Sequence, residues 1–161
     1  MSAWYDLKGD PHDFLNLQED KTGLLNSVAR IKQIIQQEIN QGIVPRRILV
    51  VGFSQGAAVA IAVGLMTDYP LGAVIGLSSF LPLRKEIFRL VENKNKTIPF
   101  FLYHNRLDNV IPVQIGAESA KILKANGYQV EFSDKYSGGH SFKPEELGKI
   151  AQEVLDKFIP K

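Results

Sequence analysis

The sequence contains no cysteine among its 161 residues. It can form no disulfide, no thiolate metal site and no thiol nucleophile, which fits a reducing compartment, and we expect a cytoplasmic protein. No apolar run approaches the roughly eighteen residues that a membrane span needs, and the first six residues have no apolar signal core. We therefore expect no stable insertion into a membrane.

Charge of one sign is also scarce. The net charge is only +2, and the sequence has no basic cluster and no stripe of alternating basic and aromatic residues, so we expect no nucleic-acid partner. The apolar fraction of 45% and the charged fraction of 22% are ordinary for a globular protein. With no internal repeat, residues 1–161 are expected to form a single domain.

The pattern of apolar residues predicts an alternation of strands and helices. Steps of three and four residues, which are typical of helices, cover residues 22–40, 57–66, 84–93, 115–125 and 144–158. Continuous apolar runs predict buried strands over residues 48–51, 73–77 and 98–103, and an alternating run predicts a strand nearer an edge over residues 129–136. Residues 1–19 are interpreted as a loop anchored by aromatic and apolar side chains, Trp4, Tyr5, Phe14 and Leu15. This order implies right-handed crossovers and an α/β fold with a mostly parallel sheet and helices on both faces.

The pentapeptide 52–56, Gly-Phe-Ser-Gln-Gly, lies between the predicted strand 48–51 and the predicted helix 57–66. A strand, a glycine-flanked serine and a helix in this order form a nucleophile elbow, where the serine sits on a strained corner and small neighbours let backbone segments pass closely. The helix then directs its free N–H groups and positive dipole end toward an anion forming near the serine oxygen. We therefore predict that Ser54 is a nucleophile.

Two predicted loops downstream of Ser54 supply an acid and a base. Chemistry in doubly wound sheets collects at the carboxyl ends of the strands, and Asp108 and His140 each follow a predicted strand. The order Ser54, Asp108, His140 is the one that α/β-hydrolases use. We predict that Ser54 attacks an acyl carbonyl, that His140 takes and returns the proton, and that Asp108 orients the imidazole.

Other titratable residues are weaker candidates. His104 also follows a strand but precedes Asp108, so it does not match the chain order and is interpreted as structural. Asp134 is the rival acid, but it falls within the predicted fourth strand, so Asp108 is preferred. His12 is interpreted as a solvated loop residue. The three histidines have no metal-binding spacing, so we expect no metal site.

Six segments of the chain share their sequence and order with motifs of one family. They are residues 1–6, 42–48, 52–58, 77–83, 108–112 and 139–141. Together they make the whole chain resemble the phospholipase/carboxylesterase family, which includes the acyl-protein thioesterases and small lysophospholipases. The resemblance implies an α/β-hydrolase fold and Ser54, Asp108 and His140 as the catalytic triad.

The same resemblance implies further roles and substrates. Gln55 would give its backbone N–H to the oxyanion hole, and Phe80, Leu81 and Val110 would line a channel for an aliphatic acyl chain. The implied substrates are long-chain acyl thioesters on proteins, lysophospholipids and simple carboxyl esters. No cofactor is implied.

Two features depart from the family pattern. The family usually has His-Gly before the acid loop, where this chain has His104 and Asn105, a change that bears on the backbone of that turn. Family members also carry an upstream strand ending in His-Gly-x-Gly-Asp, whose backbone supplies a second oxyanion donor. The sequence has no such segment, so we expect it to correspond to the C-terminal part of a family member.

Without that upstream strand, residues 48–51 are expected to form an exposed apolar edge that favours self-association. Three hypotheses follow. The chain is a serine hydrolase of the family's type, or a truncated, weakly active or inactive fragment that acts as a binding or regulatory module, or a chain whose missing strand comes from another subunit.

Overall fold

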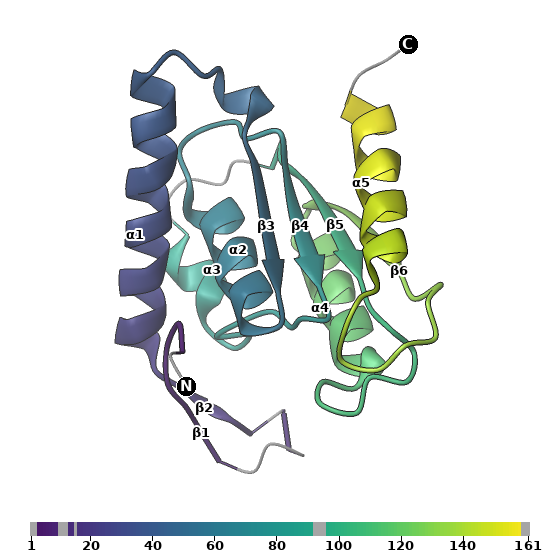
Figure 1. Ribbon diagram of the computed structural model, residues 1–161. Helices are drawn as coiled ribbons and strands as arrows, with labels where there is room; N and C mark the ends of the chain where they lie inside the picture. The colour runs from purple at the N-terminus through teal and green to yellow at the C-terminus, as the bar shows by residue number, and fades with distance from the viewer. Residues whose placement is uncertain (1–2, 10–12, 15, 92–95, 159–161) are drawn as a thin grey trace.

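The computed structural model describes residues 3–9, 13–14, 16–91 and 96–158, and its centre is a four-stranded parallel sheet (Figure 1). The strands are β3 (Leu49–Phe53), β4 (Ala73–Leu77), β5 (Pro99–Tyr103) and β6 (Gln129–Ser133), and they lie side by side in that order. All four were predicted from the sequence. The fourth is shorter than expected, because it ends at Ser133 and not at residue 136.

Helices connect the strands, and their bounds follow the apolar periodicity. They are α1 (Lys21–Asn40), α2 (Gln55–Met66), α3 (Ile87–Leu90), α4 (Val113–Ala125) and α5 (Pro144–Phe158), with one 3-10 turn at Pro45–Arg47. The Asp20 side chain accepts a hydrogen bond from Gly23 N at 3.0 Å and so caps the start of α1. Of the five, α3 departs most from prediction, since only four residues of the expected 84–93 are helical and residues 92–93 lie outside the described part.

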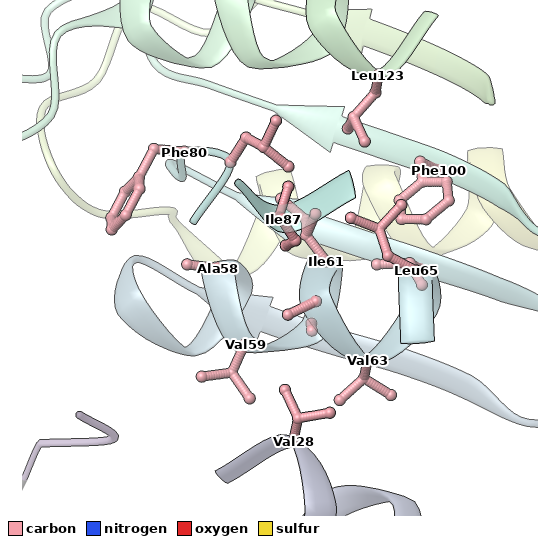
Figure 2. Close-up of a cluster of buried hydrophobic side chains, with 14 of the residues drawn as sticks. Val28, Ala58, Val59, Ile61, Val63, Leu65, Phe80, Ile87, Phe100 and Leu123 are labelled. Atoms are coloured by element: carbon pink, nitrogen blue, oxygen red, sulfur yellow. The ribbon is translucent and has the colours of Figure 1, made fainter. Parts of the chain in front are cut away.

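The larger core lies between the sheet and the layer formed by α1, α2 and α4. Residues 57–65 of α2 are all buried, because this helix packs against the sheet on one side and against α1 on the other. Val59 and Val63 point toward Val28 of α1, whereas Ile61 points to the side of Phe100 on β5 (Figure 2). Burial on all sides thus explains why α2 is apolar around its whole circumference.

Among the described helices, α5 alone lies on the opposite face of the sheet (Figure 1), where Tyr136 and Phe142 of the loop before it also pack. Ile150 and Val154 of α5 pack there with Phe101 of β5 and form a second, smaller core. On β3, Val51 remains 57% exposed and Phe53 41% exposed. The expectation that helices cover both faces of this strand is therefore wrong for one face, because among the described helices only α5 lies on this side and it packs nearer β5.

The N-terminal segment is a hairpin, which corrects the prediction of a loop. Strands β1 (Leu7–Lys8) and β2 (Gln18–Glu19) pair antiparallel. Tyr5 anchors the segment, being only 4% exposed, while Trp4 remains 45% exposed. Phe14 packs edge-on against Phe80 with ring centroids 5.1 Å apart. Leu15, the other predicted anchor, lies outside the described residues.

Close packing between α2 and the sheet generates a prediction about Gly64. A Cβ at this position would lie 2.5 Å from Val74 Cγ2 and 3.0 Å from the Phe100 ring. We expect Gly64→Ala to lower the free energy of unfolding by about 1–3 kcal/mol through overpacking. Gly148→Ala is the matched control, because a Cβ there meets nothing within 4 Å on α5. It should raise stability by up to about 1 kcal/mol. Urea denaturation measures both, and equal stabilities for the two variants would contradict the packing argument.

Candidate active site

The site is built around a sharp turn between β3 and α2. Ser54 occupies this turn with φ 55° and ψ −125°, a backbone conformation that is strained for any residue with a side chain. Two hydrogen bonds hold the strained residue. Its N–H donates to Leu77 O at 2.9 Å, and its carbonyl accepts from Ser79 Oγ at 3.1 Å. The serine is thereby fixed at the carboxyl end of β3.

Close packing explains why both ends of the pentapeptide are glycine. A Cβ on Gly52 would lie 2.3 Å from Gly56 O and 2.5 Å from Ala57 N, so a side chain there would collide with the backbone of α2. A Cβ on Gly56 would lie 3.2 Å from the indole nitrogen of Trp4. The strand-to-helix crossing therefore needs glycine at its first position above all.

Three side chains from the ends of β3, β5 and β6 meet at this turn. His140 Nε2 lies 2.9 Å from Ser54 Oγ, and His140 Nδ1 lies 2.8 Å from Asp108 Oδ2. Because a carboxylate can only accept, Nδ1 donates to it, which leaves Nε2 free to accept the serine hydroxyl proton. His140 is thus within hydrogen-bonding distance of both of the other residues predicted from chain order.

The Asp108 carboxylate is nearly buried, at 7% exposure. Burial alone would raise its pKa, but hydrogen bonds from His140 and from the backbone N–H groups of Ile111 and Val110 outweigh that effect. The pKa of Asp108 therefore lies below its ordinary value, and the group is a carboxylate over the pH range in which hydrolases work.

The rival candidates lie elsewhere. Asp134 is exposed just beyond the end of β6, so the expectation that it lies within the strand is wrong, and His140 meets Asp108 instead. His104 is fully buried. Its Nε2 donates to Ile111 O at 2.8 Å and lies 3.5 Å from Asp108 Oδ2. His12 is outside the described residues.

Gln55 directly follows Ser54 and begins α2, so its backbone N–H has no carbonyl partner within the helix. Its side chain holds the N-terminal segment: Oε1 accepts from Trp4 N at 2.9 Å, and Nε2 donates to Tyr5 O at 2.7 Å. Sequence reasoning missed this side-chain function, because the partners are some fifty residues away in the chain and no local pattern signals them.

Of the three residues expected to bind an acyl chain, two line a common cavity and one does not. Phe80 and Leu81 are buried and line a cavity of about 180 Å³. The other apolar lining residues are Phe14 and Leu17 from the segment between β1 and β2, Leu83, and Ile115 and Ile122 of α4. Val110 is 51% exposed on the acid loop and is not among the lining residues.

One carboxylate of the hairpin connects it to this cavity. Glu19 Oε1 accepts from Leu83 N at 2.6 Å, and Glu19 Oε2 accepts from Tyr5 Oη at 3.1 Å. Burial raises the pKa of Glu19, although these two hydrogen bonds act in the opposite direction. This contact was also missed from the sequence.

The described residues lack a metal cluster and a membrane-spanning helix. They hold no group of three or more His, Cys, Asp or Glu side chains placed to bind a metal ion. Nor do they include a helix with the length and apolar character needed to cross a membrane.

The fold and this arrangement define an α/β-hydrolase, and solved structures agree. SOBER1 of Arabidopsis thaliana matches with a TM-score of 0.88 and 28% identity, covering 99% of this chain and 75% of its own. Acyl-protein thioesterase 2 of Zea mays matches with a TM-score of 0.78 and 27% identity, covering 98% and 73%.

Sequence comparison gives the family. Residues 1–159 match the phospholipase/carboxylesterase family, and the chain belongs to it. Acyl-protein thioesterase 1 of Gibberella zeae is 38% identical over 165 residues, which cover 100% of this chain and 70% of that protein. The Saccharomyces cerevisiae protein of the same name is 32% identical over 157 residues, covering 96% and 68%. The chain is accordingly a carboxylic ester or thioester hydrolase by family.

The burial of His104 generates a prediction about pH. Desolvation lowers the pKa of His104 below its ordinary value of 6.5, against the opposing effects of the Ile111 carbonyl and Asp108. The neutral ring is therefore favoured in the folded state, so its stability contribution is complete above about pH 6.5 and is lost as pH falls toward the folded-state pKa.

We expect the free energy of unfolding to decrease below about pH 6.5 by up to about 1.4 kcal/mol per pH unit from this group. His104→Gln keeps a donor for Ile111 O but cannot titrate, so its stability should fall less steeply. Urea denaturation of both proteins over this pH range measures the difference, and identical slopes would rule out a neutral buried His104.

Proposed function

We propose that this chain cleaves acyl thioesters and carboxyl esters through a covalent acyl intermediate on Ser54. The observation that carries the proposal is the pair of hydrogen bonds at His140, 2.9 Å to Ser54 Oγ and 2.8 Å to Asp108 Oδ2. Nucleophile, base and orienting acid within hydrogen-bond reach are the signature of nucleophilic acyl transfer.

The proposed reaction has two halves. Ser54 Oγ bonds to the acyl carbon while His140 Nε2 takes the hydroxyl proton, and the thiol or alcohol leaves with that proton. Water then attacks the acyl-serine, His140 takes a proton from it, and Ser54 leaves with the proton as the carboxylic acid is released. Asp108 stabilises the charged imidazole in both halves.

The oxyanion of each tetrahedral intermediate needs hydrogen-bond donors. We assign the Gln55 backbone N–H to this role, since it begins α2 beside Ser54 and the helix dipole adds to its effect. The Gln55 side chain, held by Trp4 and Tyr5, supports the placement of that N–H. In the family pattern, a second donor comes from the upstream His-Gly-x-Gly-Asp segment. We assign none of the described residues to this second role.

The cavity lined by Phe80 and Leu81 supports an aliphatic acyl group as substrate, because Ser79, directly before Phe80, binds the carbonyl of Ser54. We propose that Phe80 and Leu81, together with the apolar residues of the hairpin, contact the chain. Val110 is proposed to contact substrate at the exposed rim of the site, outside this cavity. Relatives named acyl-protein thioesterase favour an acylated protein as the natural substrate, and the family description leaves a lysophospholipid as the alternative. A cytoplasmic location stays a prediction.

A second candidate is a single, partial hydrolase domain with little activity that acts as a binding or regulatory module. The outer edge of β3 favours it, because no described strand pairs there. An apolar hollow of about 260 Å³ lies beside this edge and is lined in part by Trp4, Val51 and Phe53. An apolar strand with one open edge favours pairing with another chain, either a second copy or a subunit that supplies a strand.

The proposed nucleophile is tested with a fluorophosphonate, which reacts with activated serines. We expect it to label the protein on Ser54 and expect Ser54→Ala to abolish labelling and turnover of a palmitoyl thioester. Asp108→Asn should slow turnover by up to about 10⁴-fold, because it leaves His140 in the wrong tautomer.

Asp134→Asn is the matched control for the acid, since Asp134 is exposed and does not contact His140. It should retain full labelling. Labelling that survives Ser54→Ala, or a larger loss from Asp134→Asn than from Asp108→Asn, would overturn the assignment.

The open edge generates a prediction about assembly. We expect the chain to self-associate in sedimentation velocity and expect Val51→Lys to shift it toward monomer, because a charge on an edge strand disfavours pairing. Gln152→Lys places the same charge on the exposed surface of α5 and should leave the assembly unchanged. A monomeric wild-type chain that is fully labelled by the fluorophosphonate would show that the edge needs no partner.

A further inference from the structure

Asn105 is a fully buried polar residue that follows His104 at the end of β5. Its side-chain nitrogen donates to Gly139 O at 3.0 Å and also to Ser141 O. These two carbonyl groups lie on either side of His140 in the sequence. A single amide thus contacts the backbone before and after the proposed base.

The orientation of this amide is fixed by chemistry. Both neighbouring atoms are carbonyl oxygens, which only accept, so the NH₂ group and not the oxygen of Asn105 must face them. The two hydrogens of the NH₂ group match the two acceptors. A serine or a protonated carboxyl group could donate only one hydrogen bond at this place, and an alanine none.

The segment that Asn105 holds is a tight turn. Ser141 N donates to Gly139 O at 2.8 Å, which closes a three-residue turn centred on His140. Asn105 binds the carbonyl groups at both ends of this turn. Because the turn sets where the His140 side chain leaves the backbone, fixing its ends also fixes the direction of the imidazole.

The neighbouring loop is shaped to admit the amide. A Cβ on Gly138 would lie 3.0 Å from Asn105 Nδ2 and 3.3 Å from its Cγ, so glycine leaves the space that the side chain occupies. Backbone hydrogen bonds run in parallel, from Leu107 N to Gly138 O at 3.2 Å and from Arg106 N to Tyr136 O at 2.9 Å. The loop of Asp108 and the loop of His140 are thereby joined directly, and Asn105 is the buried side chain in that junction.

We propose that Asn105 is a positioning residue that holds the His140 turn so that the imidazole spans Asp108 and Ser54. The inference rests on the proposed function, because it assigns Asn105 a role through His140 and none in contact with substrate. It also explains the departure from the family pattern noted above, since glycine at this position has no side chain with which to hold the turn.

The kinetic consequence follows from the geometry. His140 must accept a proton from Ser54 and return it to a leaving group, and proton transfer of this kind needs the heavy atoms within about 2.6–3.2 Å of each other. A misplacement of about 1 Å can cost about 10²-fold in rate. None of the residues that we propose to contact substrate lies on this turn, so the effect should fall on kcat and leave KM nearly unchanged.

The test compares Asn105→Ala with the wild-type chain. We expect kcat and the rate of fluorophosphonate labelling to fall about 10- to 100-fold, with KM within about threefold. Asn126→Ala is the matched control, because it removes an amide-to-carbonyl hydrogen bond at the exposed end of α4. It should change these rates by no more than about twofold.

A spectroscopic readout separates this proposal from the proposed function. The Nδ1 proton that His140 shares with Asp108 should give a far-downfield proton NMR resonance in the wild-type chain and in Asn126→Ala. We expect Asn105→Ala to broaden or abolish it. This signal requires no turnover. A wild-type chain that shows the resonance but does not label would refute the hydrolase function, and the resonance of Asn105→Ala would still decide the role of Asn105.

A second variant covers the case in which Asn105→Ala does not fold. Gly138→Ala keeps the Asn105 amide but displaces it by a few tenths of an ångström. Like Asn105→Ala, it should therefore broaden the resonance and slow labelling. In a folded Asn105→Ala background the added effect of Gly138→Ala should be much smaller, because both changes act through one contact. Wild-type rates and an unchanged resonance in either single variant would overturn the proposal.

Discussion

An ionised carboxyl group that is almost removed from water needs hydrogen-bond donors, and Asp108 takes them from three sides. The backbone N–H groups of Val110 and Ile111 reach Oδ1, and His140 reaches Oδ2. Hydrogen bonds to the charged form outweigh the cost of burial, so the group stays a carboxylate. The buried His104 binds the carbonyl of Ile111 and so also holds the loop that carries Asp108. The hydrogen bond from His140 Nδ1 to this charge orients the ring, whose Nε2 then reaches Ser54 Oγ.

Much of the fold could be predicted because the signals are local. Apolar residues at helical spacing predict the long helices α1 and α5, and a continuous apolar run between turns predicts β4. The elbow could be predicted as well. Any side chain at Gly52 would collide with the backbone at the start of α2, so a strand that turns directly into a helix here needs glycine at this position. Once a parallel sheet is expected, the meeting of Ser54, Asp108 and His140 follows from the ends of its strands.

What the sequence did not predict depends on contacts between distant segments. The hairpin of residues 7–8 and 18–19 is held by Gln55, which donates to Tyr5 O, and by Leu83 N, which donates to Glu19. Two-residue strands carry no periodicity of their own. The exposure of Val51 could not be foreseen either, because an apolar strand indicates burial on both faces without saying which helix supplies each cover.

The non-glycine residues with positive φ, among those described, are Ser54, Ser78 and Leu83. Ser54 forms the elbow, Ser78 interacts with Asp108, and Leu83 lines the cavity. Such conformations cost about 1–3 kcal/mol each and persist only where the surroundings over-determine them.

The segment from Ser78 to Leu83 meets that condition along its length. Ser78 N donates to Tyr103 O at 2.8 Å, Leu81 N to Ser119 Oγ at 2.8 Å, and Leu83 N to Glu19 Oε1 at 2.6 Å. Because the backbone of this segment is held at both strained ends and in the middle, the fold itself positions Phe80 and Leu81, the residues that we propose to contact an acyl chain. Side chains that need no rearrangement lose less entropy on binding, so the strain at Ser78 and Leu83 accompanies a preorganised cavity wall.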